Sequence, residues 1–315
     1  MDGIHRDNRL LSIACILTAI GFASTQDAVV KFMSGNFGAY EAVIFRCIGS
    51  FPLLAVLLYR EGGFRRLATP LLWRVLLRSI ILCVGYFTFI LSIASMPIAN
   101  SVAIYFTMPF FVAGLAGPIL GERVRLHRWL AIMAGFIGVL IMVRPGAGVF
   151  EPAAILALVS AFSYAIGQMI GRPIAHQVPL TVIAMWQSTV FLTVALLFAV
   201  AFNSFDFSWL THKSLVFLTR PWVWPDPLDA VVLLSNGILA AVGMILFVSA
   251  YKYAESNFVA PFEYSSMIWA VTYGFFVFGD FPDSFTWLGV AVVATAGILM
   301  VWRDRQLDRA IVHNP

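Results

Sequence analysis

The sequence predicts an all-α membrane protein in which ten transmembrane helices form two inverted five-helix repeats. Three observations lead to this fold class. Hydrophobic residues make up 61% of the 315 residues and charged residues only 11%, whereas a soluble domain carries about 25% charged residues. The apolar residues gather in long runs, which must be helical in a bilayer because every backbone N–H and C=O has to be paired internally. Finally, the second half of the chain repeats the first.

Two fixed offsets between the halves reveal this repeat. At an offset of 158 positions the later parts of the halves align, with Tyr105 on Glu263, Gly121 on Gly279 and Trp129 on Trp287. At an offset of 141 positions the earlier parts align, with Asp27 on Gln168, Lys31 on Arg172 and Arg46 on Gln187. The offsets differ because a longer polar loop, residues 203–227, belongs to the second half alone. This pattern is typical of a duplicated membrane protein.

Taken in order, the apolar runs predict ten spanning helices of about 20 residues each. They cover residues 10–33, 40–59, 73–95, 98–119, 126–143, 152–172, 180–202, 228–251, 257–278 and 285–302. The first run follows a charged start, but it is too long for a signal peptide and no small-residue cleavage site follows, so we expect an uncleaved first span. The spans divide the chain into a cytoplasmic N-terminus (1–9), a first repeat (10–146), a second repeat (147–302) and a cytoplasmic C-terminal tail (303–315).

The distribution of Lys and Arg predicts the orientation in the membrane. With the N-terminus inside, 15 of the 20 basic residues lie on the cytoplasmic side, four lie outside and Arg46 lies within a span. We therefore expect a multi-pass protein of the cell inner membrane with both termini in the cytoplasm. Since each repeat has an odd number of spans, the second crosses the membrane upside down relative to the first. The net charge of +4 is explained by this orientation and needs no nucleic-acid partner.

Residue types that carry other chemistry are dispersed or missing from the sequence. The three cysteines lie in different predicted spans, and the five histidines fall in loops or termini, which predicts neither a disulfide framework nor a metal site. The sequence contains no GxxxxGK[ST] phosphate loop and no GxSxG element. We therefore expect no cofactor, and neither a membrane enzyme nor an ATP-driven pump is favoured. Small residues such as Gly135 and Gly138 indicate close helix packing.

The most informative residues are charges inside the spans, each of which costs about 2.5–3.5 kcal/mol at a helix centre on insertion scales. Asp27 and Arg46 each lie six residues below the outer end of neighbouring antiparallel helices, a depth of about 9 Å. Two readings stay open. The pair is a salt bridge that locks two helices together, or it borders a cavity in which Arg46 binds an anionic group of a substrate. Lys31 and Glu41 are expected to be interfacial and structural.

Glu263 lies six residues into the ninth span, and no Lys or Arg of the second half falls at its expected depth. Gln168 and Gln187 fall in the same layer. A carboxylate in surroundings of low dielectric constant tends to take up a proton. Glu263 is therefore either a protonated side chain that is hydrogen-bonded to a neighbouring helix, or a residue that contacts substrate or relays protons.

Pro109 and Pro261 are expected to interrupt the fourth and ninth helices, because each removes a backbone N–H and frees a carbonyl. Aromatic side chains near them are suited to stack a flat ligand, and the candidates are Tyr86, Tyr105, Phe106, Trp186, Tyr264 and Trp269. Tyr105 and Tyr264 are favoured because they flank the breaks. The predicted substrate-binding or coupling residues are thus Asp27, Arg46, Tyr105, Gln168, Gln187, Glu263 and Tyr264.

Two copies of five spans, each with a fourth helix that ends in Gly-Glu or Gly-Asp and a Trp-containing fifth span, resemble the drug/metabolite transporter superfamily with its paired EamA-type domains. The resemblance covers residues 10–302. More narrowly, four segments resemble the subset that includes S-adenosylmethionine uptake carriers, namely Ser24–Phe32, Tyr40–Arg46, Ala260–Tyr264 and Phe278–Asp283. Asp280 stands where Glu is usual, which retains the charge.

The resemblance implies a secondary active transporter that moves a small polar or aromatic metabolite by alternating access, with proton coupling or substrate exchange. It also implies a cavity lined mainly by spans one, three, four, six, eight and nine. The expected partners are the substrate and the lipid bilayer, and a homodimer is left open. Alternatives from other classes are a membrane-embedded enzyme, a lipid-modifying protein and a structural membrane protein, and the fold alone does not identify the cargo.

Overall fold

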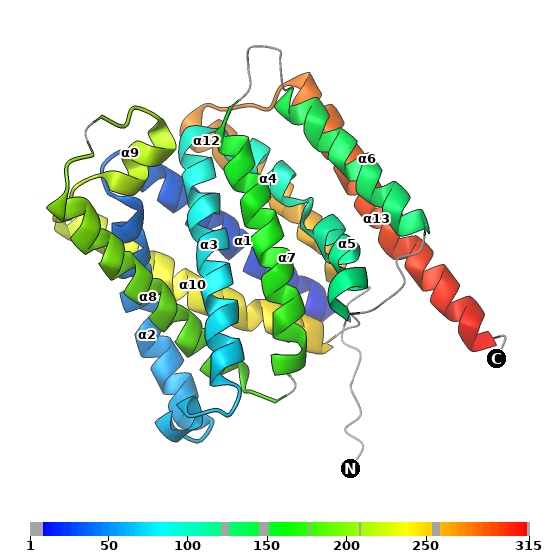
Figure 1. Cartoon of the computed structure of the whole chain (residues 1–315), viewed down its shortest axis with the longest axis horizontal. Coiled ribbons are helices and arrows are strands. Elements are labelled where there is room, and N and C mark those ends of the chain that lie inside the picture. Colours follow the sequence, from blue (N-terminus) through cyan, green and yellow to red (C-terminus); the bar gives the residue numbers. More distant parts are fainter. Residues whose placement is uncertain are drawn as a thin grey trace.

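Helices make up all the regular secondary structure in the described part of the chain. The structure is a computed structural model that describes residues 9–120, 126–144, 151–175, 177–207, 209–253 and 259–313. Its helices, drawn in Figure 1, are α1 (Arg9–Met33), α2 (Ala39–Arg60), η1 (Phe64–Leu67), α3 (Leu72–Ser95), α4 (Ile98–Tyr105), α5 (Met108–Leu120), α6 (Leu126–Val143), α7 (Ala153–Ala175), α8 (Leu180–Ser204), α9 (Lys213–Thr219), α10 (Pro227–Tyr253), η2 (Ala260–Ser265), α12 (Ser266–Phe278) and α13 (Ser284–His313). Each predicted range overlaps one of these helices or, for the fourth and ninth ranges, two of them, and residues 257 and 258 of the ninth range lie outside the described residues. The short helix α9 lies in the predicted polar loop.

Within the described residues, seven helices are long and apolar enough to cross a membrane. Two shorter apolar stretches accompany them, Trp129–Val143 in α6 and Ser284–Met300 in α13. Large apolar side chains such as Leu197 and Ile268 are exposed on the outside of the bundle, where lipid tails would cover them. The chain is therefore a multi-pass membrane protein.

The predicted proline breaks are confirmed. α4 ends at Tyr105 and α5 begins at Met108, directly before Pro109. The ninth predicted span contains the 3₁₀ helix η2, which has Pro at its start, followed by α12. α12 ends at Gly279, whose φ of 70° lies in the left-handed region, a conformation that glycine adopts without the penalty of a Cβ.

The chain ends differ from the sequence expectation. α13 continues to His313, whereas the predicted tenth span ends at residue 302. Residues 303–313 are largely charged, so they end the apolar run, but they contain neither Gly nor Pro and so do not end the helix. The predicted boundary between the repeats, at residues 146 and 147, and residues 1–8 of the predicted N-terminal part lie outside the described residues.

Helix packing follows the duplication. The repeat pairs α1 with α7 and α3 with α10, and in the structure α1 packs along α10 while α7 packs along α3. Figure 1 shows α3 and α7 side by side in the centre of the bundle. The fifth and tenth predicted spans, α6 and α13, pack on each other. The packing of α1 on α10 thus corresponds to the packing of α7 on α3, with the two halves exchanged. Two copies of one unit would produce this arrangement.

The crossing of α6 and α13 depends on two glycines. A Cβ added to Gly138 would lie 2.9 Å from the carbonyl oxygen of Gly289, and a Cβ added to Gly289 would lie 2.6 Å from that of Gly138. The two backbones are therefore in direct contact, which confirms the close packing that Gly138 predicts. Small residues permit such approach in membrane helices, where dispersion contacts replace the hydrophobic effect as the source of association.

The ion pairs between described residues lie at one end of the bundle, which we call the outer end because the predicted orientation places it outside the cell. Lys31 Nζ lies 3.0 Å from the Asp280 carboxylate and donates to the carbonyl oxygen of Met96. Arg144 at the end of α6 pairs with Asp283, which precedes α13. These contacts tie α1 to the end of α12 and α6 to the start of α13.

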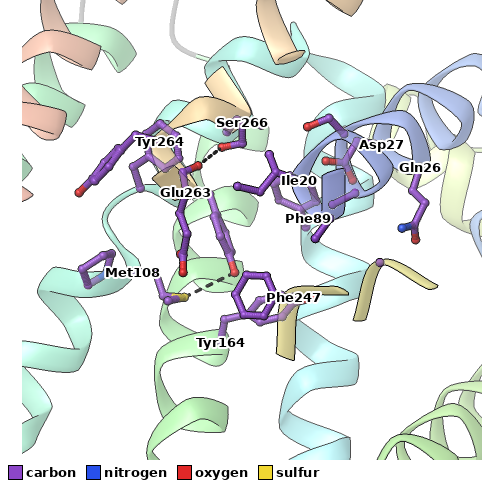
Figure 2. A pocket seen from close by; sticks show the side chains of 18 of the residues that line it. Ile20, Gln26, Asp27, Phe89, Met108, Tyr164, Phe247, Glu263, Tyr264 and Ser266 are labelled. Carbon is purple, nitrogen blue, oxygen red and sulfur yellow. Dashed lines mark hydrogen bonds between the residues drawn. The ribbon is translucent and has the colours of Figure 1, made fainter. Parts of the chain in front are cut away.

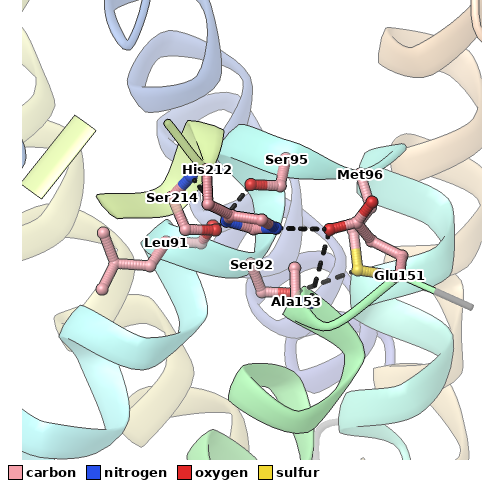
Figure 3. A network of polar contacts seen from close by, with 8 residues as sticks. All are labelled: Leu91, Ser92, Ser95, Met96, Glu151, Ala153, His212 and Ser214. Carbon is pink, nitrogen blue, oxygen red and sulfur yellow. Dashed lines mark hydrogen bonds and ion pairs between the residues drawn. The ribbon is translucent and has the colours of Figure 1, made fainter. Parts of the chain in front are cut away.

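The loop between α8 and α10 covers the same end. His212, directly before α9, lies 3.0 Å from the Glu151 carboxylate, and the hydroxyl of Ser214 contacts that of Ser95 at the end of α3. Figure 3 shows both contacts. The buried carboxylate of Glu41 accepts the backbone N–H of Gly38 at 2.5 Å and that of Val223 at 2.6 Å. These contacts of Glu41, like the ion pair of Lys31, agree with the structural roles expected for both residues.

Candidate substrate-binding site

A cavity of about 590 Å³ lies between the two repeats. Every helix that was expected to line it contributes: α1, α3, the α4–α5 pair, α7, α10 and the η2–α12 pair. The helices α2 and α13 also contribute, through Arg46 and through Gly297, Ile298 and Trp302. A volume of this size is suited to a metabolite of a few tens of heavy atoms.

The two helix breaks meet in the wall of this cavity. Tyr105 and Phe106 come from the first break, and Glu263 and Tyr264 come from the second. The rings of Phe106 and Tyr264 touch edge to face, with centroids 4.9 Å apart at 63°. At the offset of 158 positions these two residues correspond to each other. The cavity is therefore centred where the two repeats contact each other through equivalent positions.

Arg46 is held on the cavity wall by aromatic and amide neighbours. Its guanidinium carbon lies 4.6 Å from the ring centroid of Tyr86 and 6.0 Å from that of Phe191, which are cation–π distances. Its Nε lies 3.5 Å from the side-chain oxygen of Gln26, a long hydrogen bond. Tyr86 and Phe191 are themselves 5.5 Å apart. These contacts orient the guanidinium plane without using its two terminal nitrogens.

Asp27 lines the same wall as Arg46, as their equal depth predicts. The two charges influence each other, but over the described residues the pair does not come within the 4.0 Å that defines a salt bridge. The salt-bridge reading is therefore wrong for this conformation, and the cavity-bordering reading fits. Depth in the membrane follows from sequence position, whereas the direction in which each side chain points depends on the rotation of both helices.

Glu263 lines the same cavity as Asp27, and Figure 2 shows the two side chains apart from each other. Its backbone carbonyl accepts the hydroxyl of Ser266 at 2.9 Å, which closes the turn from η2 into α12. The hydroxyl of Tyr105 lies 3.5 Å from the Met108 sulfur, across the first break. Tyr105 also contacts Tyr164 edge to face, with centroids 5.4 Å apart. The wall between the two carboxylates is thus largely aromatic.

Six of the seven predicted site residues line the cavity, and Gln187 does not. Gln187 instead accepts a hydrogen bond from Arg78 Nη1 at 3.1 Å, inside the wall formed by α3 and α8. Two of the aromatic candidates also lie elsewhere. Trp186 donates to the backbone oxygen of Leu67 at 3.1 Å, and Trp269 packs beside Tyr273 with centroids 6.0 Å apart.

Several lining residues were not predicted, including Gln26, Tyr164, Phe247 and Gly297. Helical periodicity could have found Tyr164, because it lies four residues before Gln168 and so shares its face. Phe247 and Gly297 carry no comparable signal, since an apolar residue and a glycine in a spanning helix are most often packing residues. Among the described residues, no cluster of three or more His, Cys, Asp or Glu side chains could hold a metal ion.

The arrangement can bind a flat ligand that carries opposite charges. Aromatic rings cover much of the wall, one guanidinium stands at the side of α2, and carboxylates stand on α1 and η2. Inside a low-dielectric cavity such groups discriminate strongly between charged and neutral ligands, because a mismatched charge is left without compensation.

Comparisons with known proteins give the family of the chain. The model of the EamA-like transporter family matches residues 10–144 and 151–303. The S-adenosylmethionine uptake transporter of Rickettsia prowazekii (strain Madrid E) is 20% identical over 298 residues, which cover 94% of each chain. The riboflavin transporter of Vibrio cholerae serotype O1 is 26% identical over 289 residues, 90% of each chain. A solved crystal structure superposes with a TM-score of 0.63 at 17% identity, covering 95% of this chain and 99% of the other, which supports the fold.

Proposed function

Because the chain belongs to the EamA-like transporter family, within the drug/metabolite transporter superfamily, we propose that it is a secondary active transporter of a small polar or aromatic metabolite. The family consists of transporters rather than enzymes. In this proposal the ten helical ranges are ten membrane spans, the protein resides in a bacterial inner membrane, and substrate crosses by alternating access through the cavity described above.

The contact between Phe106 and Tyr264 is the observation that carries this proposal. The two residues occupy equivalent positions of the two repeats and meet in the cavity wall. In transporters built from inverted repeats, the substrate site lies at the repeat interface near the membrane midplane, and one repeat moves against the other around it. A cavity at this contact is therefore accessible in turn from each side.

The arrangement of charges favours an inward-facing state. Lys31 and Asp280 form an ion pair at the outer end, with 3.0 Å between their charged atoms. The cavity begins below this pair, at Asp27 and Arg46, and extends to Phe247, Glu263 and Trp302 in the half that the predicted orientation assigns to the cytoplasm. Opening toward the outside would then require the ion pair between Lys31 and Asp280 to separate. Proton movement or substrate exchange would drive the cycle, with Glu263 as the candidate coupling residue.

Reporter fusions test the orientation and the number of spans. Fusions after Arg65, Arg125 and Arg305 are expected to report cytoplasm, and a fusion after Lys213 is expected to report periplasm, because 15 of the 20 basic residues then lie inside. A periplasmic signal after Arg125 would contradict both the ten-span count and the inverted repeat.

Substrate counterflow in proteoliposomes tests the proposed activity. The relatives named for S-adenosylmethionine and riboflavin suggest these two compounds as first cargoes, and counterflow detects carriage in either direction. The variant Tyr105→Ala removes a ring from the cavity wall and is expected to lower the rate, whereas Tyr59→Ala is a matched control because that ring is 76% exposed and lies outside the cavity. Equal rates for both variants, or no counterflow with a broad metabolite panel, would contradict the proposal.

A further inference from the structure

Asp27 and Arg46 form an open pair of charges in the cavity wall. Both line the cavity, and each charge influences the other, yet they are not within 4.0 Å of each other. The two terminal nitrogens of Arg46 make no hydrogen bond to any residue that the structure describes, and the Asp27 carboxylate likewise accepts none there. The N–H donors of Arg46 and the carboxylate oxygens of Asp27 are therefore available to a ligand in the cavity.

The protein holds this pair apart by contacts of its own. Tyr86 and Phe191 lie within cation–π distance of the guanidinium of Arg46, and Gln26 contacts its Nε, so these neighbours leave the terminal nitrogens without a hydrogen bond from them. Asp27 follows Gln26 on the same turn of α1. A guanidinium held by these contacts keeps its two terminal N–H groups available to a ligand, and such a fork binds a carboxylate through two parallel hydrogen bonds.

We propose that this open pair binds the zwitterionic head group of an amino-acid-like substrate, with the substrate carboxylate on Arg46 and its ammonium group on Asp27. The flat body of the substrate then lies along Tyr105, Tyr164 and Tyr264, toward Glu263. This inference rests on the proposed function, since it names the substrate class of the same cavity. A zwitterion is favoured over a single ion because it compensates both charges at once.

The pattern of binding to three matched probes separates this proposal from a general aromatic cavity. L-Tryptophan carries both charges, tryptamine lacks the carboxylate and indole-3-propionate lacks the ammonium group. Calorimetric titration of the purified protein is expected to give the tightest binding with L-tryptophan or, in a parallel titration, with S-adenosylmethionine. The single-charge probes are expected to bind about tenfold more weakly or worse, the effect of losing one charged hydrogen-bonding group.

Two variants are expected to reverse specific parts of this pattern. Arg46→Gln should weaken L-tryptophan and indole-3-propionate about tenfold and leave tryptamine unchanged. Asp27→Asn should weaken L-tryptophan and tryptamine and leave indole-3-propionate unchanged. Because each variant has a probe whose affinity does not change, a misfolded protein cannot produce this result. Gln187→Ala is the control outside the cavity and should change none of the three affinities.

Three results would overturn the inference: no binding of either zwitterion, equal affinities for zwitterions and single-charge probes, or a uniform loss across all probes in each variant. The outcome is separable from that of the proposed function. Counterflow of riboflavin without binding of the zwitterions would leave transport standing and remove the head-group site. The crossed pattern of affinities without any counterflow would establish the head-group site and remove transport.

Discussion

The two repeats contribute different chemistry to the cavity at corresponding positions. The first repeat places Asp27 and Arg46 on the wall, whereas the second repeat carries Gln168 and Gln187 at the equivalent positions. Of these two amides only Gln168 lines the cavity, since Gln187 binds Arg78 within the wall. The two repeats thus build the cavity from corresponding helices, but both members of the open charge pair come from the first repeat.

The second helix break shows the opposite difference. Glu263 stands in the second repeat where Tyr105 stands in the first, and both line the cavity. Charged side chains therefore line the cavity at two separate places, with a pair of opposite charges on the first repeat and a single carboxylate on the second. We infer that the first place recognises the substrate and the second couples its movement to protons, and the predictions below test this division.

The largest effect is expected from Glu263→Gln. The amide keeps the shape and hydrogen bonding of a protonated carboxyl but cannot exchange a proton, so accumulation driven by a pH gradient should be lost while exchange of substrate for substrate is retained. Uptake and exchange in proteoliposomes measure the two modes. Glu151→Gln is the matched control, because Glu151 lies at the outer end beside His212 and outside the cavity. Normal gradient-driven uptake by Glu263→Gln would remove Glu263 as the coupling residue.

A double-mutant cycle on Asp27 and Arg46 is expected to give the next largest effect. Since the residues do not touch each other, their changes should be nearly additive in the free energy of unfolding but strongly coupled in the affinity for a zwitterion. The cycle uses Asp27→Asn, Arg46→Gln and the combined variant, measured by thermal unfolding and by calorimetric titration with L-tryptophan. Coupling in unfolding and none in binding would restore the reading of the pair as a structural salt bridge.

Gly297→Ala should have a smaller effect that acts through Tyr264. A Cβ at Gly297 would clash with the hydroxyl of Tyr264, so the ring must move into the cavity or the helices must separate, which costs about 1–3 kcal/mol of stability. Gly243→Ala is a close control, because Gly243 also lines the cavity but its Cβ would meet Phe22 at an ordinary 3.5 Å. Similar transport and stability in both variants would show that the Tyr264 ring can shift away from the added Cβ at no measurable cost.

The smallest effect on transport is expected from Gln187→Ala. Its loss leaves Arg78 without the acceptor at 3.1 Å, so stability should fall by about 1–3 kcal/mol while the rate per folded molecule stays near that of the wild type. Gln168→Ala, which removes the equivalent of Asp27 from the cavity wall, should lower the rate more and the stability less. The opposite result, in which Gln187→Ala lowers the rate more than Gln168→Ala does, would mean that Gln187 acts in the site as its counterpart Arg46 does.

Much of the fold follows from the sequence because membrane helices are specified by simple physics. Apolar runs of about 20 residues must be helical in a bilayer, so the predicted ranges coincide with helices where the structure describes them. Seven of these helices are long and apolar enough to cross a membrane. The end of α13 was not, because charged residues end a hydrophobic run without ending a helix. The short helix α9 (Lys213–Thr219) has too few residues for a periodic signal.

The candidate site was predictable in depth but not in direction. Position along a helix gives depth in the membrane, which is why the sequence places Asp27 and Arg46 at one level. The repeat offset likewise identifies Tyr105 and Glu263 as corresponding positions of the two helix breaks. Whether a side chain turns into the cavity depends on partners from other helices. Gln187 bonds to Arg78 on α3, and the guanidinium of Arg46 lies over the ring of Tyr86. Neither contact leaves a pattern in a single sequence.

Substrate protection of one cysteine tests the central claim, that the cavity between the two helix breaks is the transport site, most directly. Ser266 lines the cavity beside Glu263, and the variant Ser266→Cys places a single thiol there. The three buried native cysteines, Cys15, Cys47 and Cys83, are first replaced by alanine. The rate of labelling by a membrane-impermeant maleimide in inside-out vesicles is measured with and without the compound that gives counterflow. We predict labelling from the cytoplasmic side that the transported compound slows. A transported compound that leaves the labelling rate unchanged would contradict the account.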